Sequence, residues 1–240
     1  MRGTSQRERP RLRAPASAAP GRRPYDEVVR LLLIRHGQTP SNVLRALDTG
    51  APGPGLTEIG IQQAADLVAS LAHEPIAALF ASNLHRAQLT AAPLAAALGL
   101  EVSVREGLRE IAAGCLEMRS DAASIVAYHD VLEAWMRGRH DARLDGGEAC
   151  TEVYARFNAV IGEAEALSAE LGALGGGVAG RAVAIVSHGA MIRAWCGRHA
   201  VNVDPDFVAA QNLANTGIVV LNGSSAEGWT VETWEGLRIV

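Results

Sequence analysis

Two histidines stand out because each follows a short run of apolar, largely branched residues. His36 comes shortly after the run at 28–34, and His188 comes shortly after the run at 182–186. If these runs are parallel strands of one sheet, both imidazoles lie at the same edge, where α/β proteins bind ligands. A neutral imidazole, with a pKa of about 6.5, is a good nucleophile towards phosphorus. The pair therefore indicates phosphoryl chemistry.

A glycine follows each of the two histidines. Gly37 and Gly189 lack a side chain, so the backbone can approach a ligand closely at these positions. A helix is predicted to begin after His188, and its free N–H groups would favour an anion at the same edge. Both features fit a site for a phosphate group.

Two arginines can reach the same edge. Arg35 directly precedes His36, and Arg86 lies in the first turn of the helix that follows a second predicted strand at 76–80. The planar guanidinium pairs with two phosphate oxygens at once. Because a phosphoryl group in transfer spreads charge over three oxygens, several such donors are needed together.

A leaving alcohol also needs a proton, and Glu110 is the leading candidate to supply it. It follows a short strand and precedes an irregular loop, so it could overhang the pocket. A carboxyl group against apolar walls has a raised pKa and can act as a general acid. Glu117 is the alternative acid. Four other histidines show no metal-ligand spacing, and we expect surface or structural roles for them: His85, His129, His140 and His199.

The elements that must position these residues alternate between strand and helix. Strands are predicted at 28–34, 76–80, 101–104 and 182–186, with a closing pair at 217–221 and 229–233 around a turn at Asn222-Gly223. Helices are predicted after a cap at Thr57, after a cap at Ser82 or Asn83 and up to Gly99, at 121–135, at 150–174, and from His188 to about His199. Residues 172–180 should form a surface turn. This alternation predicts a three-layer α/β/α sandwich with a mostly parallel central sheet.

Length and composition fit one large domain. The chain has 240 residues, of which 48% are hydrophobic, enough for a substantial core. We predict a disordered basic tail at 1–26 and a folded domain at 27–240. No apolar run reaches the roughly 18 residues that a membrane span needs. Three cysteines without a CxxC pair argue against a disulfide framework and suit a reducing cytoplasm.

Charge is distributed unevenly along the chain. Residues 1–30 contain eight arginines and three acidic residues, whereas the whole chain has a net charge of −4, which leaves −9 for the remainder. A basic arm can bind nucleic acid or an acidic membrane. A solvated tail is the interpretation we favour, and an acidic body is a poor partner for nucleic acid. We therefore expect neither nucleic acid nor membrane as a partner.

Five motifs occur in an order and at spacings that resemble the histidine phosphatase superfamily, also called phosphoglycerate mutase-like. A single triplet would be weak evidence, but five in order over residues 30–221 are specific. The motifs are Arg35-His36-Gly37-Gln38-Thr39 with Asn42, Ser82-Asn83-Leu84-His85-Arg86-Ala87 with Thr90-Ala91, Leu108-Arg109-Glu110 with Gly114, Gly146-Gly147-Glu148, and Ser187-His188-Gly189.

The resemblance implies a two-step hydrolysis of a phosphorylated small molecule without metal or cofactor. His36 would become phosphohistidine, while Arg35, Arg86 and a protonated His188 hold the phosphoryl oxygens. Glu110 would protonate the leaving oxygen and then activate water. The phosphate-binding set would be completed by residues that match the family's positioning contacts and by the two glycines: Thr39, Asn42, Gly37 and Gly189. Members of the family often form homodimers, so a homodimer is possible here.

Some residues depart from the family pattern. Ala190 stands where mutases of the family typically have asparagine, and no basic insertion for a bisphosphate cofactor is evident between Gly114 and Gly146. The loop 111–117 also differs, which prevents an inference of the substrate. These departures favour a phosphatase over a cofactor-dependent phosphoglycerate mutase. A third alternative is a catalytically silent protein that binds a phosphorylated ligand.

Overall fold

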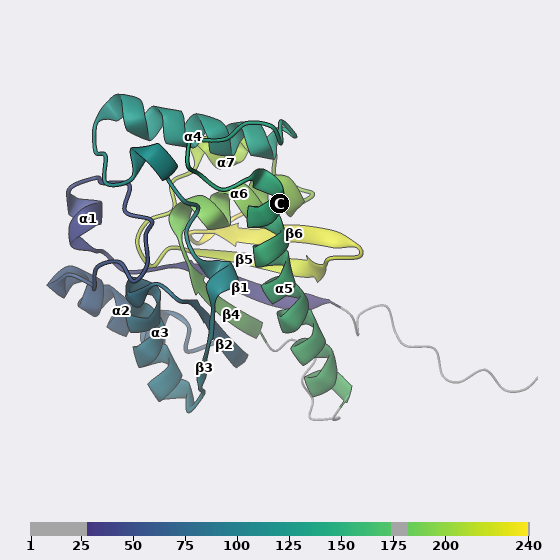
Figure 1. The fold of residues 1–240 in the computed structure, drawn as a ribbon. Helices are drawn as coiled ribbons and strands as arrows, with labels where there is room; N and C mark the ends of the chain where they lie inside the picture. The colour runs from purple at the N-terminus through teal and green to yellow at the C-terminus, as the bar shows by residue number, and fades with distance from the viewer. Residues whose placement is uncertain (1–27, 174–181, 240) are drawn as a thin grey trace, which may run out of the picture.

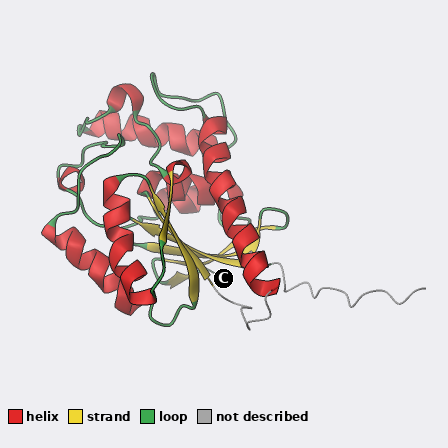
Figure 2. Cartoon of the chain, turned by 60° about the horizontal axis from the view of Figure 1, so that its bottom comes forward, coloured by secondary structure: helices red, strands yellow, loops and turns green. Residues whose placement is uncertain are grey.

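A computed structural model describes residues 28–173 and 182–239 (Figure 1). The predicted tail at 1–26 and most of the predicted turn at 172–180 lie outside the described residues. Within the described part, one seven-stranded sheet has the strand order β3-β2-β4-β1-β5-β6-β7. Helices cover both faces of this sheet (Figure 2). The predicted α/β/α sandwich is therefore confirmed.

The strands divide the sheet into a parallel and an antiparallel half. In the first half, β1 pairs with β4, β4 pairs with β2, and β2 pairs with β3, and all three pairings are parallel. On the other side of β1 the pairings to β5, β6 and β7 are antiparallel. The bounds are β1 (Val29–Arg35), β2 (Ile76–Ser82), β3 (Val102–Arg105), β4 (Ala182–Ser187), β5 (Ile218–Ser224), β6 (Gly228–Trp234) and β7 (Leu237–Arg238).

The helices follow the predicted order, with additions that the sequence patterns did not indicate. The short helices α1 and α7 were not predicted, nor were the two 3-10 turns near Glu110. The bounds are α1 (Pro40–Val43), α2 (Glu58–Ser70), α3 (His85–Leu98), α4 (Ala122–Met136), α5 (Cys150–Ala173), α6 (Gly189–His199), α7 (Pro205–Ala210), η2 (Glu106–Leu108) and η3 (Gly114–Leu116).

The central strand β1 is buried on both faces, as its unbroken apolar sequence predicts. Leu31 and Leu33 contribute to the core beneath the layer formed by α4, α5 and α6, whereas Leu32 and Ile34 contribute to the core beneath α2 and α3. Each of these side chains is fully buried. Burial stabilises by about 1.5–3 kcal/mol per side chain of this size. The strand end that carries Arg35 and His36 is thus anchored in two cores.

Helix boundaries confirm some predicted caps and correct one. Thr57 caps α2 by accepting a hydrogen bond from the Gly60 amide, and Gly99 ends α3 in a left-handed conformation. The predicted cap of α3 at Ser82 or Asn83 is wrong, because the cap position is Leu84, which makes no side-chain cap bond. Ser82 is still the last residue of β2, and its hydroxyl accepts from the Leu84 amide.

The predicted turn at Asn222-Gly223 is also wrong. Both residues lie inside β5 and pair with Thr230 and Trp229 of β6. Gly223 is needed within the strand because a side chain there would overlap the Gly228 carbonyl. The chain therefore reverses after Ser224, beyond the two residues whose types favour a turn.

Helices α4 and α6 pack closely against each other. Gly197 on α6 faces Met136 on α4, and a side chain at position 197 would overlap the Met136 sulfur. The lack of a side chain at Gly197 therefore leaves room for the Met136 side chain between the two helices. In the described residues, 28–173 and 182–239, we find no helix with the length and apolar character of a membrane span.

Candidate functional site

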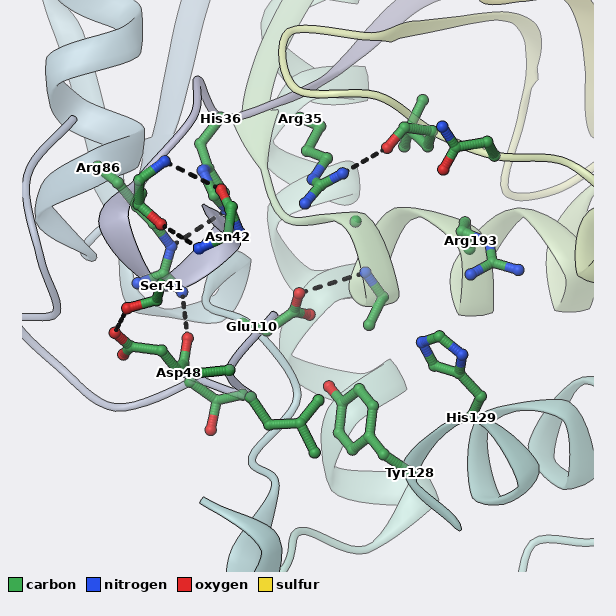
Figure 3. Close-up of a pocket in the computed structure, with 18 residues that line it drawn as sticks. Arg35, His36, Ser41, Asn42, Asp48, Arg86, Glu110, Tyr128, His129 and Arg193 are labelled. Atoms are coloured by element: carbon green, nitrogen blue, oxygen red, sulfur yellow. Dashed lines mark hydrogen bonds between the residues drawn. The ribbon is translucent and has the colours of Figure 1, made fainter. Parts of the chain in front are cut away.

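A cavity of about 230 Å³ opens at the carboxyl ends of the parallel strands (Figure 3). Seven predicted site residues line it: Arg35, His36, Thr39, Asn42, Arg86, Glu110 and Gly189. His188 lies behind the wall, fully buried, with its ring centroid 5.1 Å from that of His36. The parallel pairing of β1 with β4 brings the two histidines together, because Arg35 pairs with Ser187.

The His36 ring is oriented for attack through Nε2. Its Nδ1 lies 2.8 Å from the Gly37 carbonyl oxygen, which can only accept, so Nδ1 carries the proton. Nε2 accepts a hydrogen bond of 3.2 Å from Arg86 Nε. Burial lowers the pKa of His36 well below its ordinary value, and the Arg86 and Arg35 charges lower it further. The ring is therefore neutral, with a lone pair on Nε2.

The charge of His188 depends on what lies beside it. Burial lowers the pKa of His188 well below its ordinary value, and the Arg86 charge lowers it further. The ring is therefore neutral before an anion binds, and the protonated form predicted for contact with phosphoryl oxygens stays a prediction. Nε2 is bonded to the Ser82 hydroxyl at 2.8 Å, whereas Nδ1 is buried without a hydrogen-bond partner among the described residues. Ser82, predicted as a helix cap, instead fixes the orientation of this ring.

The two arginines are held by backbone carbonyls and keep free donors. Arg35 Nη1 donates to the Leu213 carbonyl at 2.6 Å, and Arg86 Nη2 donates to the Asp48 carbonyl at 3.0 Å. Arg35 Nε and Arg86 Nη1 are buried with no partner among the described residues. Burial lowers the pKa of both guanidinium groups. Unpaired buried donors are costly, so these groups are arranged for an anion that completes their bonds.

Glu110 lies between this cluster and the outer part of the cavity (Figure 3). Its carboxyl oxygens accept from the amides of Ile111 at 3.0 Å, Met191 at 2.9 Å and Ala190 at 3.2 Å. Burial raises its pKa, although these bonds and the Arg86 charge oppose the rise. A carboxyl group that holds its proton at higher pH is suited to donate it.

Glu110 also changes the expected role of α6. The free N–H groups at the start of this helix were expected to favour the ligand, but those of Ala190 and Met191 are bonded to Glu110. A side chain brought in from another segment satisfies them before any ligand arrives. The amides at the start of α6 therefore hold the Glu110 carboxyl group in place, and the arginines are the groups that can bind an anion.

A largely buried ion pair, of which the sequence motifs indicated only Glu148, holds the backbone around Glu110. Arg156 Nη1 donates to the carbonyls of Gly107 and Arg109, both at 2.8 Å, and its Nη2 donates to the Glu110 carbonyl at 3.2 Å. Glu148 bonds Arg156 Nε at 2.9 Å and accepts from the Ala112 amide at 3.0 Å. Arg156 carries no motif signal, since it lies in the middle of the long helix α5.

Glu117, the alternative acid, has a different role. Its carboxylate accepts hydrogen bonds from the Thr49 amide at 2.7 Å, the Thr49 hydroxyl and the Gly50 amide. It does not line the cavity. These contacts hold the loop that precedes α2 and leave Glu110 as the acid that faces the site.

Thr39 and Asn42 form a capping box at α1, in which each side chain bonds the other residue's amide. Asn42 Oδ1 also accepts from Asn215 Nδ2 at 3.0 Å, and the same Asn215 group donates to the His36 carbonyl at 3.0 Å. Asn215 was not predicted. It stands alone in the loop before β5, where no local pattern indicates a function.

The two glycines serve different purposes. Gly189 lines the cavity, and a side chain there would press against Arg35 Nε. Gly37 does not line the cavity, and its amide donates to Thr90 Oγ1 at 2.9 Å. A side chain at Gly37 would overlap the Gly60 carbonyl. The structure thus places Gly37 in the contact with α2 and away from the predicted phosphate position.

The outer end of the cavity contains residues that the motifs did not indicate. Tyr128 and His129 come from α4, and Arg193 comes from α6. His129, expected in a surface or structural role, faces Arg193 across the cavity (Figure 3). Within residues 28–173 and 182–239, no three His, Cys, Asp or Glu side chains are grouped as a metal site would require.

Comparison with known proteins identifies relatives over most of the chain. A family profile described as the histidine phosphatase superfamily (branch 1) matches residues 31–236. The PE-PGRS family protein PE_PGRS11 of Mycobacterium tuberculosis is 34% identical over 217 residues, which cover 86% of this chain and 36% of that protein. The probable phosphoglycerate mutase GpmB of Yersinia pestis is 32% identical over 134 residues, 56% of this chain and 62% of that protein.

A solved structure shows the same architecture. The native structure of a mycobacterial glucosyl-3-phosphoglycerate phosphatase superposes with a TM-score of 0.69 at 29% identity, covering 87% of this chain and 99% of that one. The matches span less than two thirds of the length of either curated relative.

Proposed function

Because the chain belongs to the histidine phosphatase superfamily, we propose that it hydrolyses phosphomonoesters of small molecules through a phosphohistidine intermediate, without a metal. One observation carries the proposal. Nε2 of a neutral His36 lies among nitrogens of Arg35, Arg86 and His188 that have no hydrogen-bond partner in the described part of the chain. A nucleophile surrounded by such donors matches the needs of a phosphoryl group, whose charge grows on its outer oxygens during transfer.

In the first step, the Nε2 lone pair of His36 attacks phosphorus, and the bond from phosphorus to the ester oxygen breaks. Arg86, whose Nε donates to Nε2 at 3.2 Å, turns its N–H groups to the phosphoryl oxygens. Arg35 Nε and His188 Nδ1 supply further donors. The Ser82 hydroxyl, which already accepts from the Leu84 amide, can donate to His188 Nε2, and in that ring form the proton is on Nδ1.

Glu110 transfers the protons of both steps. Its raised pKa keeps a proton available, which passes to the leaving oxygen as the ester bond breaks. In the second step, a water molecule attacks the phosphohistidine and gives a proton to the Glu110 carboxylate. His36 Nε2 leaves with its lone pair restored, and inorganic phosphate is released.

The direct test is phosphate release from a panel of phosphorylated metabolites in the presence of a chelator. We expect wild-type turnover to survive chelation, and His36→Ala to lose at least about 10³-fold in kcat because the covalent nucleophile is removed. His140→Ala, at an exposed histidine outside the cavity, is the matched control. Unchanged turnover in His36→Ala, or full dependence on an added metal, would reject the proposal.

A cofactor-dependent phosphoglycerate mutase is the second candidate, favoured by the match to the probable mutase GpmB. A mutase would require catalytic 2,3-bisphosphoglycerate and would interconvert phosphoglycerates without releasing phosphate. Ala190, whose side chain is apolar and whose amide is bonded to Glu110, favours the hydrolase. If no ester of the panel turns over by either route, a silent phosphate-binding protein becomes the better account.

A further inference from the structure

Arg193 projects from α6 into the outer end of the cavity. Its Nη2 donates to the carbonyls of Val208 at 3.1 Å and Ala209 at 3.2 Å, in the last turn of α7. These bonds fix the position of the guanidinium. Its Nε is buried and has no hydrogen-bond partner among the described residues.

No carboxylate of the described residues forms an ion pair with Arg193 within 4.0 Å. Arg30, Arg109 and Arg156 differ, since each of them contacts a glutamate. A partly buried cation without a counter-ion is unfavourable, and its desolvation is offset when an anion binds beside it. Burial lowers the pKa of Arg193, and the charge of Glu110, which lies beyond ion-pair distance, opposes this shift.

The path of the substrate leads from the histidines towards Arg193. Figure 3 shows His36 and Arg86 at one end of the cavity, Glu110 between, and Arg193 with His129 at the other end. The leaving oxygen must meet Glu110, so the alcohol beyond that oxygen extends towards Arg193. The two ends are parts of one cavity, and a single small molecule can occupy both.

We propose that Arg193, with His129 beside it, binds a second anionic group on the alcohol of the substrate, so that the preferred substrate is a phosphomonoester that also carries a carboxylate or another phosphate. This proposal rests on the proposed function and specifies its substrate class. The bonds to Val208 and Ala209 use only Nη2. A role confined to joining α6 and α7 therefore does not account for Nε, which is buried and unbonded among the described residues.

The test compares two esters that differ by one group. In 3-phosphoglycerate a carboxylate replaces the hydroxymethyl group of glycerol 3-phosphate, and 2,3-bisphosphoglycerate keeps that carboxylate and adds a second phosphate at C2. We expect wild-type kcat/KM to be higher for an ester with the second anion. Arg193→Met should lower that value about 30- to 100-fold, mainly through KM, with a loss at least tenfold smaller on glycerol 3-phosphate.

Further variants separate binding from folding. His129→Glu places a carboxylate at an exposed position beside Arg193, and we expect the same selective loss without a fall in Tm. Arg193→Lys, which keeps the charge, should recover part of the discrimination. Arg198→Met, at an exposed arginine of the same helix, is the matched control and should match wild type.

Two outcomes would overturn the proposal. One is an equal loss on both esters in Arg193→Met, and the other is a wild-type enzyme that does not distinguish them. Calorimetric binding of the same esters to the His36→Ala protein gives a result independent of turnover. If the protein binds the ester with the second anion more tightly but wild type hydrolyses neither ester, the Arg193 site is retained and the phosphatase is rejected. If wild type hydrolyses both esters equally well, the phosphatase is retained and the Arg193 site is rejected.

Discussion

The two ends of the cavity are built differently. At the inner end, His36, His188 and Arg86 follow the strands β1, β4 and β2, whose backbones are fixed by pairing within the sheet. At the outer end, His129 and Arg193 come from α4 and α6, whose relative position depends on side-chain packing. The inner end fits the phosphoryl group that any substrate of this reaction shares. The outer end can vary with the alcohol while the reaction stays the same.

The largest effect that tests this contrast is expected at Arg86. Arg86→Met removes a guanidinium that contacts His36 at 3.2 Å and faces the phosphoryl position. We expect kcat/KM to fall about 10³-fold, because a donor aligned with the developing charge is lost. The fall should be equal for esters of different alcohols, as measured by phosphate release across the panel.

Arg86→Lys keeps the charge and changes the geometry, so it should recover only a small part of the loss. If Arg86→Met affected esters of different alcohols to very different extents, the inner end would not be the common phosphoryl site.

Glu110 lies between the two ends, and its variant should distinguish leaving groups. We expect Glu110→Gln to lower kcat about 10²-fold for alkyl phosphates, which need a proton on the leaving oxygen, and much less for 4-nitrophenyl phosphate. In the wild type, the protonated fraction of Glu110 falls as pH rises through its pKa, which burial places above the ordinary value. Activity on alkyl esters should therefore fall as pH rises through that pKa.

The measurement is the pH profile of kcat/KM for both types of ester. In Glu110→Gln the decline at higher pH should disappear for alkyl phosphates. A decline that persisted unchanged in the variant would assign it to another group.

A smaller effect is expected from the ion pair behind Glu110. Glu148→Gln weakens the contact with Arg156, and both side chains are largely buried. We expect a loss of about 3 kcal/mol in the free energy of unfolding, measured by urea denaturation, since breaking a buried pair leaves one charge unpaired. Turnover should fall about tenfold through misplacement of the acid.

The double variant Glu148→Gln, Glu110→Gln shows whether this loss acts through Glu110. In that background the further loss of turnover should be small. A full tenfold loss on top of Glu110→Gln would mean that Glu148 affects the site by another route.

The smallest effect concerns a helix far from the outer end. Thr57→Ala removes the cap of α2, because the Thr57 hydroxyl accepts from the Gly60 amide at 3.0 Å. The expected cost is about 1 kcal/mol of stability. Turnover at a temperature well below Tm should stay unchanged for all esters. A selective change between alcohols would show that α2 takes part in substrate choice.

The inner end could be predicted from sequence because its signals are local. A strand of branched residues that ends in Arg35 and His36, and another that ends before His188, identify a sheet edge without knowledge of the remaining contacts. Glu110 was also predicted, but its bonds to the Ala190 and Met191 amides were not, because two distant segments must pack before they form.

The outer end could not be predicted for the same reason. His129 and Arg193 are 64 positions apart in the chain and meet only when α4 packs on α6. Arg156 and Asn215 act through backbone carbonyls, which every residue has and no motif marks. The lowered pKa of His188 could not be predicted either, because it depends on burial and neighbouring arginines, which only the folded chain determines.

The close contact at Gly197 links a packing position to the outer end of the cavity. A single added methyl group there would overlap the sulfur of Met136, so the flexible Met136 side chain would have to turn away. Met136 lies on α4, the helix that also carries Tyr128 and His129 into the cavity. Any adjustment of α4 to such an exchange would therefore reach the outer end, whereas the strand ends that carry His36 and His188 belong to the sheet.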